Sequence, residues 1–110
     1  MKQGEIWETY FDPVEGQEQS GRRPAVIISG NTMNNNLNLV IVCPLTSKIH
    51  NYKGHPVVEP NPENGLKHPS EVLVFQTRAV AKKRLRKKIG MLDMATINTI
   101  HQTVQKILKF

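Results

Sequence analysis

Two adjacent arginines stand where a polar segment ends and an apolar run begins. Arg22 and Arg23 precede Pro24, and residues 24–29 read PAVIIS, a β-branched sequence typical of a buried strand. A rigid strand holds the base of such a side chain, while the planar guanidinium group can bind a phosphate through two hydrogen bonds. The spacing therefore indicates an anchored cation that faces the polar segment.

Hydroxyl-bearing residues follow the most apolar run of the chain. Residues 37–44 read LNLVIVCP and predict a central strand, and Thr46 and Ser47 lie where that strand ends. Their hydroxyl groups could donate hydrogen bonds to a phosphate oxygen, although such residues at strand ends commonly form turns. Gln76 is a polar residue in a second apolar run. Its amide is either a buried group with satisfied partners or a contact to a bound base or to the reacting centre.

The histidines offer a different chemistry, but their placement does not favour it. They show no spacing typical of metal ligands and no acidic pair near them, and the glycines form no phosphate-binding loop, so we expect neither a metal nor a cofactor. Two histidines acting as general acid and base remain an alternative. Most of them fall in loop-like segments, where we expect them at the surface: His50, His55 and His68.

Charge is divided unevenly along the chain. It has 15 Lys and Arg against 9 Asp and Glu, a net charge of +6. Residues 1–20 carry a net charge of −4, so residues 21–110 carry +10, and the densest run is KKRLRKK at 82–88. A surface this basic attracts polyanions, nucleic acid above all, although a solvated basic surface is the simpler alternative.

The elements that must position these groups are mostly strands. Asp93 can cap a terminal helix, because after it apolar residues recur at spacings near 3.6. Residues 30–36, with four asparagines, predict a turn, residues 82–88 predict a basic turn or short helix, and residues 89–91 return briefly to the sheet. The predicted strands are residues 4–11, 24–29, 37–44, 55–59 and 71–78. Five consecutive strands and one helix favour a small, mostly antiparallel barrel with a C-terminal α-helix, an α+β fold in a single domain over residues 1–110.

Composition excludes several classes of protein. The single cysteine, Cys43, can form neither an internal disulfide nor a cysteine-based zinc site. No apolar segment follows Lys2 as a signal peptide requires, and the longest apolar run is too short to span a bilayer, so we expect a cytoplasmic protein with no membrane partner. Only 38% of residues are hydrophobic, which suggests that a partner or a second copy completes the buried surface.

Three sequence segments together carry a resemblance to a known family. They read GEIWETYFDPVEGQEQSGRRPAVIIS, VIVCPLTS and PSEVLVFQTRAVAKKRLRKKIGMLD, and they follow one another over nearly the whole chain. In this order and spacing the chain resembles the MazF/PemK (Kid) family of toxin endoribonucleases, the mRNA interferases of type II toxin–antitoxin systems. The resemblance implies an SH3-like barrel of the CcdB/Kid/MazF kind that works as a homodimer.

The same resemblance implies an activity and a partner. Proteins of the family cleave single-stranded RNA at short sequences without a metal, leaving a 2′,3′-cyclic phosphate and a 5′-hydroxyl, which blocks translation and arrests growth. Their partner is a MazE-like antitoxin, a DNA-binding dimer with an acidic tail, so DNA enters only through the antitoxin.

By position, the resemblance implies roles for particular residues. The catalytic arginine and threonine of the family fall on Arg23 and Thr46, and its loop glutamate falls on Glu18. Arg23 would act mainly as electrostatic stabiliser, and the general base is either Glu18 or a deprotonated Arg23. Phe75 stands where the family often has an acidic residue, so we carry no role over to it. The residues expected to bind RNA are Gln19, Ser47, Gln76, Arg78, Lys82 and Lys83.

Two other functions fit the same composition. One is a CcdB-like gyrase poison, a binding protein that needs no Arg23 and Thr46 pair and leaves naked RNA intact. The other is a basic barrel that binds RNA in a salt-dependent way without cutting it.

Overall fold

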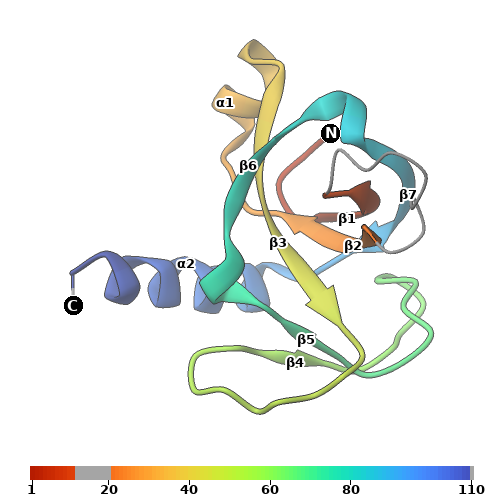
Figure 1. The fold of residues 1–110 in the computed structure, drawn as a ribbon, viewed down its shortest axis with the longest axis vertical. Helices are drawn as coiled ribbons and strands as arrows, with labels where there is room; N and C mark the ends of the chain where they lie inside the picture. Colours follow the sequence, from red (N-terminus) through yellow and green to blue (C-terminus); the bar gives the residue numbers. More distant parts are fainter. Residues whose placement is uncertain (12–20, 110) are drawn as a thin grey trace.

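The computed structural model describes residues 1–11 and 21–109. Figure 1 shows the curved strands β1, β2 and β7 on one side of the long strand β3, with the helix α2 extending to the other side. The elements in chain order are β1 (Glu5–Tyr10), β2 (Arg22–Ile27), α1 (Asn31–Asn36), β3 (Leu39–Thr46), β4 (Val57–Val58), β5 (Ser70–Val72), the 3₁₀ turn η1 (Val74–Gln76), β6 (Arg78–Ala81), the 3₁₀ turn η2 (Lys82–Arg84), β7 (Leu85–Met91) and α2 (Met94–Lys109).

Strand β3 organises the sheet. It pairs in antiparallel fashion with β2, β5 and β6, and β1 joins β2 to β7, so the strand order is β4-β5-β3-β2-β1-β7 with β6 also on β3. The predicted architecture of a small antiparallel barrel with a C-terminal helix is therefore confirmed.

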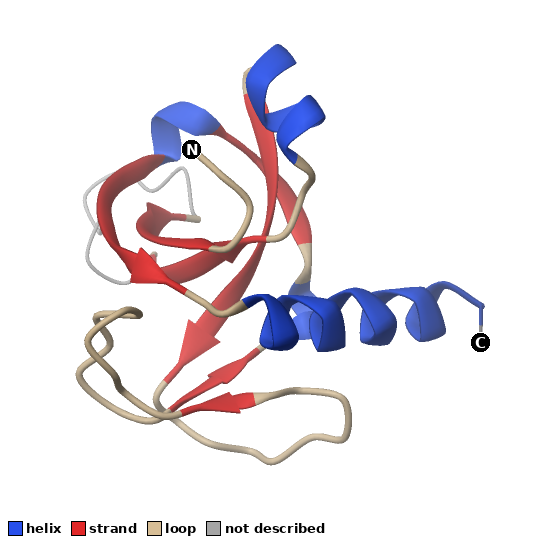
Figure 2. Cartoon of the chain, turned by 180° about the vertical axis from the view of Figure 1, so that it is seen from behind, coloured by secondary structure: helices blue, strands red, loops and turns tan. Residues whose placement is uncertain are grey.

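Buried apolar residues form two clusters on opposite faces of β2 and β3, because successive side chains of a strand alternate between faces. Figure 2 shows α2 lying across the sheet, and its Ile97 and Ile100 pack into the first cluster with Val26, Cys43 and Leu45. The second cluster fills the barrel and contains Phe11, Ala25, Ile27, Val40, Val42, Val80 and Leu85. The face of β2 and β3 that lines the barrel continues outward to the candidate site.

The prediction of one continuous strand over residues 71–78 is wrong. In the sheet, β5 pairs Glu71 with Thr46, whereas β6 pairs Arg78 with Val42. These partners lie four residues apart on β3 but seven residues apart on the other segment, so three residues must leave the sheet. Residues 74–76 form η1 for this reason, so Gln76 lies on a 3₁₀ turn and not in the predicted strand.

Two other segments also differ from expectation. Residues 82–88 are neither a turn nor a helix throughout: η2 ends at Arg84, and the remainder belongs to β7, where Lys88 Nζ lies 3.3 Å from the Glu5 carboxylate. The expected turn at residues 30–36 contains the short helix α1, stabilised because the buried Asn34 side chain bonds the Ser29 hydroxyl at 2.5 Å.

The terminal helix begins as predicted. Asp93 directly precedes α2, and its carboxylate accepts a hydrogen bond from the Thr96 hydroxyl at 2.6 Å, which lowers the pKa of Asp93. Met94, Ile107 and Leu108, which the apolar periodicity also includes, stay exposed. Within the described residues, no helix is long and apolar enough to cross a membrane.

Candidate functional site

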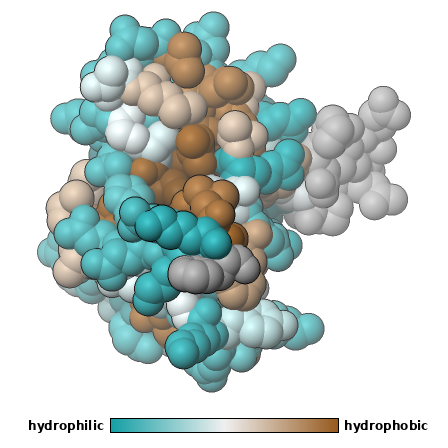
Figure 3. Space-filling view, turned by 90° about the vertical axis from the view of Figure 1, so that its left-hand side faces the viewer, coloured by the Kyte–Doolittle hydropathy of each residue, from teal (hydrophilic) through white to brown (hydrophobic). Residues whose placement is uncertain are grey.

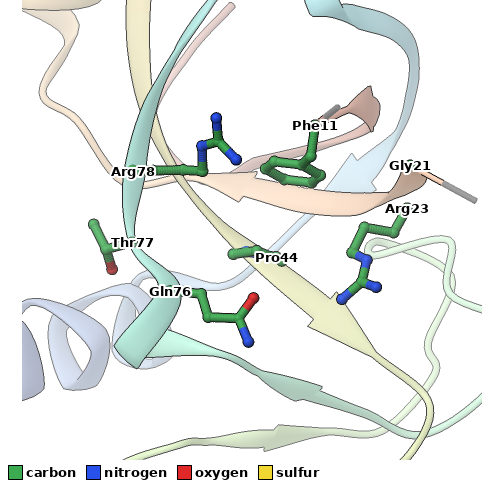
Figure 4. A pocket seen from close by; sticks show the side chains of 7 residues that line it. All are labelled: Phe11, Gly21, Arg23, Pro44, Gln76, Thr77 and Arg78. Atoms are coloured by element: carbon green, nitrogen blue, oxygen red, sulfur yellow. The ribbon is translucent and has the colours of Figure 1, made fainter. Parts of the chain in front are cut away.

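A pocket of about 390 Å³ opens where β2, β3, η1 and β6 meet. Figure 4 shows the guanidinium group of Arg23 and the amide of Gln76 on either side of Pro44, with Arg78 close to Phe11. The pocket is lined by Phe11, Gly21, Arg23, Pro44, Gln76, Thr77 and Arg78.

Arg23 and Thr46 lie opposite each other at the ends of neighbouring strands. The register of β2 and β3 pairs Ala25 with Pro44, and two residues further along each strand it leads to Arg23 and Thr46. Because side chains two residues apart share a face, both residues point from the face that carries Pro44. Arg23 is exposed and Thr46 is half-buried. The fold thus brings the two residues predicted as catalytic to neighbouring strand ends, with Arg23 in the pocket lining and Thr46 outside it.

Thr46 has a defined hydrogen-bonding role. Its Oγ1 accepts the backbone N–H of Lys48 at 3.1 Å. A hydroxyl oxygen that accepts in this way still has its own hydrogen to donate. The strand-end threonine is therefore both part of a turn and a potential donor, so the two interpretations of this residue are compatible.

Arg78 and Gln76 reach the pocket from the other side of β3. The Cζ atom of Arg78 lies 5.6 Å from the centre of the Phe11 ring, a cation–π contact that fixes the side chain beside the opening. Gln76 is exposed and lines the same pocket, so its amide is not a buried group with satisfied partners. Phe11 was missed as a site residue, because its strand pattern indicated only a core position.

The remaining predicted residues lie elsewhere. Ser47 lines a separate pocket of about 490 Å³ together with Lys87 and Lys88. Lys82 and Lys83 lie on η2, away from the pocket of Arg23, and the Lys82 amine donates to the backbone carbonyl of Asn34. The predicted residues that fall within 12–20, outside the described residues, are Glu18 and Gln19.

His55 is not the surface residue that its loop context suggests. It is buried, and its Nδ1 lies 2.8 Å from Oε2 of Glu71, a carboxylate with no exposed surface. Burial raises the pKa of Glu71, but hydrogen bonds from His55 and from three backbone N–H groups outweigh this effect and lower the pKa to about 2. An acidic residue inside the apolar run EVLVF was the one signal in the sequence that could have revealed this pair.

The Cys43 thiol is not a reactive group near neutral pH. Burial raises its pKa to about 11, partly offset by the hydrogen bond with Thr77, so it remains a neutral thiol near pH 7. Among the residues that the structure describes, no three His, Cys, Asp or Glu side chains gather into a group that could hold a metal ion.

Comparison with known families identifies the family to which the fold belongs. A family model described as a PemK-like, MazF-like toxin of type II toxin–antitoxin system matches residues 2–108. The chain belongs to this family. The endoribonuclease MazF of Staphylococcus saprophyticus is 31% identical over 106 residues, which cover 94% of this chain and 88% of that protein. The endoribonuclease MazF9 of Mycobacterium tuberculosis is 28% identical over 110 residues, which cover 96% and 93%.

Solved structures have the same fold. The crystal structure of MazF from Deinococcus radiodurans has a TM-score of 0.79 at 23% identity and covers 100% of this chain and 97% of that one. An endoribonuclease in complex with its cognate antitoxin, from Mycobacterial species, has a TM-score of 0.78 at 21% identity, with coverage of 98% and 94%. These structures confirm the expected kind of barrel with its C-terminal helix.

Proposed function

We propose that this chain is the toxin of a toxin–antitoxin module and a sequence-specific endoribonuclease that cuts single-stranded RNA, including messenger RNA, without a metal. The observation that carries the proposal is the pocket that Arg23 shares with Gln76 and Arg78, with Thr46 at the facing end of the neighbouring strand. Membership of the toxin family and relatives named as endoribonucleases support it.

The proposed reaction is an internal transesterification. The ribose 2′-oxygen attacks the neighbouring phosphorus, the new bond to the 2′-oxygen forms, and the bond to the 5′-oxygen breaks. The 2′-hydroxyl gives its proton to a base and the 5′-oxygen takes up a proton, so the products are a 2′,3′-cyclic phosphate and a 5′-hydroxyl. No water, metal or redox partner is consumed.

Arg23 and Thr46 act on the charge that develops during this reaction. The guanidinium group of Arg23 supplies a fixed positive charge, and the Thr46 hydroxyl, whose oxygen is already engaged by Lys48, donates to a phosphate oxygen. A preorganised donor of this kind typically accelerates a reaction by roughly 10²–10³-fold.

The family resemblance leaves two candidates for the general base, Glu18 and a deprotonated Arg23. Arginine has a pKa above about 12, so it accepts a proton poorly near neutral pH. We therefore assign the base to Glu18 first, and to a deprotonated Arg23 second. Glu18 belongs to the acidic N-terminal part of the chain, where a negative charge would only weaken simple RNA binding and so fits a chemical role better.

RNA binding involves more surface than the pocket. Arg78 and Gln76 would contact the phosphate and base nearest the reacting bond. The proposed path of the RNA backbone and bases extends over Gln19, Ser47, Lys82 and Lys83. Contacts to phosphates give affinity, whereas contacts to unstacked bases give sequence preference.

The proposed assembly is a homodimer that binds a MazE-like antitoxin in the cytoplasm. Figure 3 shows apolar residues gathered on the face from which the end of α2 projects. Large apolar side chains that stay exposed include Leu37, Leu39, Ile107 and Leu108. A second copy would cover such surface, and an acidic antitoxin segment would compete with RNA for the basic part of the chain. Two solved complexes with similar folds, an MazE–MazF complex and the mycobacterial endoribonuclease with its antitoxin, support this partner.

One assay tests the activity and separates it from its alternatives. The purified protein is incubated with a long RNA in EDTA, and the cut ends are mapped. We expect cuts at one recurrent short sequence, with 5′-hydroxyl ends, and none from Arg23→Ala purified in the same way, which controls for contaminating nucleases. Uncut RNA together with gyrase inhibition would support the CcdB-like function. Salt-dependent binding without fragments would support the non-catalytic barrel.

A further inference from the structure

The loop that follows Thr46 is organised around one buried carboxylate. Glu71 Oε1 accepts the backbone N–H groups of His50 at 2.6 Å and Asn51 at 2.7 Å. Its Oε2 accepts the N–H of Tyr52 at 3.4 Å and contacts Nδ1 of His55 at 2.8 Å. Because four groups from one loop converge on a single side chain, the position of the loop depends on Glu71.

His55 connects this carboxylate to η1. Its Nε2 accepts the backbone N–H of Phe75 at 3.2 Å, and a backbone N–H can only donate. Nε2 must therefore carry no proton, so the proton lies on Nδ1 and is donated to Glu71. The imidazole is thus held as one neutral tautomer, with a donor on the Glu71 side and an acceptor on the η1 side.

The segment held by His55 is the one that carries Gln76 into the pocket. Phe75 and Gln76 are consecutive residues of η1, which stands outside the β ladder because of the register difference between β5 and β6. Within residues 1–11 and 21–109, the Gln76 amide has no hydrogen-bond partner of its own to fix it. The backbone of η1 therefore sets where this side chain enters the pocket.

We propose that His55 is a positioning residue for RNA cleavage, which holds η1 so that the Gln76 amide faces the substrate across from Arg23. The inference rests on the proposed function and adds a residue that touches no substrate. Glu71 fixes the tautomer and orientation of the imidazole, and the imidazole fixes the backbone of η1. A displacement of about 1 Å at a reacting centre can reduce a rate by roughly 10²-fold, so this hold affects cleavage.

Two substitutions separate the donor side of the imidazole from its acceptor side. The amide of His55→Asn reaches the place of Nδ1 and can still donate to Glu71, but it offers no acceptor to Phe75. The amide of His55→Gln reaches the place of Nε2 and can accept from Phe75, but it loses the contact with Glu71. A merely structural role predicts that both variants are affected in proportion to their loss of stability.

The experiment compares these variants in EDTA on one RNA that the wild-type protein cuts. We expect His55→Asn to lower kcat/KM by roughly 10-fold to 100-fold, with faster hydrogen exchange at the Phe75 amide, and His55→Gln to retain more activity despite its lower stability. Gln76→Ala should lower kcat/KM by a similar factor, and the double variant His55→Asn with Gln76→Ala should be no slower than Gln76→Ala alone. The exposed Gln102→Asn on α2, outside the pocket of Arg23 and that of Ser47, is the control and should cleave at the wild-type rate.

Opposite results overturn the inference. Wild-type cleavage by His55→Asn, or losses that multiply in the double variant, would show that His55 does not act through Gln76. A greater loss in His55→Gln than in His55→Asn would indicate that stability alone matters. Failure of the proposed function looks different, since the wild-type protein would then leave the RNA uncut.

Discussion

Arg23 on β2 and Glu71 on β5 lie on opposite sides of β3 and differ in how their polar groups are satisfied. Thr46 lies between these two residues, because it pairs with Glu71 on one side and continues the register toward Arg23 on the other. The carboxylate of Glu71 is fully buried and has four hydrogen-bond contacts. Arg23 is exposed at the pocket. The comparison suggests that polar groups saturated within the protein set the geometry, whereas those left open to a ligand perform the chemistry.

The largest expected effect comes from Arg23, the residue that is open to a ligand. Arg23→Ala should reduce cleavage by roughly 10²–10³-fold, because a preorganised charge at the phosphate is lost. Its midpoint of urea unfolding should stay near that of wild type, since the side chain is exposed. Single-turnover cleavage assays and urea denaturation measure the two properties.

The adjacent arginine is the matched control for this prediction. Arg22→Ala removes the same charge, but Nε of Arg22 lies 3.6 Å from the Glu8 carboxylate and the side chain covers the Tyr10 ring. Its loss of cleavage should be far smaller. Equal losses in the two variants would mean that total charge matters and not the position of Arg23.

The next largest effect is expected at Glu71, where the substitution should lower the stability of the protein. Glu71→Ala leaves the N–H groups of the loop without their acceptor, and bonds of this type to a charged group contribute about 1.5–3 kcal/mol each. We expect the free energy of unfolding to fall by about 3 kcal/mol, measured by urea denaturation at pH 7. A change below about 0.5 kcal/mol, as is typical of surface substitutions, would contradict the view that this centre sets the geometry.

Acid should weaken the hydrogen bonds around Glu71 in a defined pH range. The pKa of Glu71 lies near 2 in the folded protein, against an ordinary value of 4.5. A lowered pKa means that the stabilisation is complete above about pH 4.5 and is lost as the pH falls toward 2. Urea midpoints measured from pH 7 to pH 3 should therefore decline more steeply for wild type than for Glu71→Gln. Parallel curves would show that Glu71 does not titrate as inferred.

The smallest effect concerns binding at the pocket rim. Arg78→Ala should weaken binding of an uncleavable RNA by a few-fold and reduce the slope of log K against log salt concentration by about 0.7 for one lost contact to single-stranded RNA. Fluorescence anisotropy at several salt concentrations measures both quantities. An unchanged slope would mean that Arg78 stacks on Phe11 without reaching a phosphate.

Sequence patterns identified what depends on local order and missed what depends on distant partners. The apolar runs and the Asp93 cap predicted the strands and the start of α2, because alternation, helical period and capping are local properties. The break in the strand at η1 could not be predicted, since it arises from the registers of β5 and β6 on β3. Burial of His55 likewise depends on Glu71, a residue 16 positions away.

The candidate site shows the same division. Arg23, Thr46 and Gln76 could be named from their residue types and from the family resemblance. That Arg23 and Gln76 meet at one pocket, with Thr46 at the end of the strand beside Arg23, depends on the pairing of β2, β3 and β6. Phe11 was not recognised because an aromatic residue in a strand looks the same whether it fills a core or supports a cation.

The three-residue detour at η1 also bears on how such a protein can change over evolution. Its backbone is held by N–H groups, through Gln76 N–H to the Leu73 carbonyl, Thr77 N–H to the Val74 carbonyl and Phe75 N–H to His55. None of these bonds uses the side chain of Phe75 or Gln76. The Gln76 side chain is therefore free to vary while β5 and β6 keep their places on β3, whereas the Phe75 ring also packs on the His55 imidazole, with 4.2 Å between the ring centres. A change of the residue at this position can therefore alter the proposed RNA specificity, in evolution or by design, without loss of the fold.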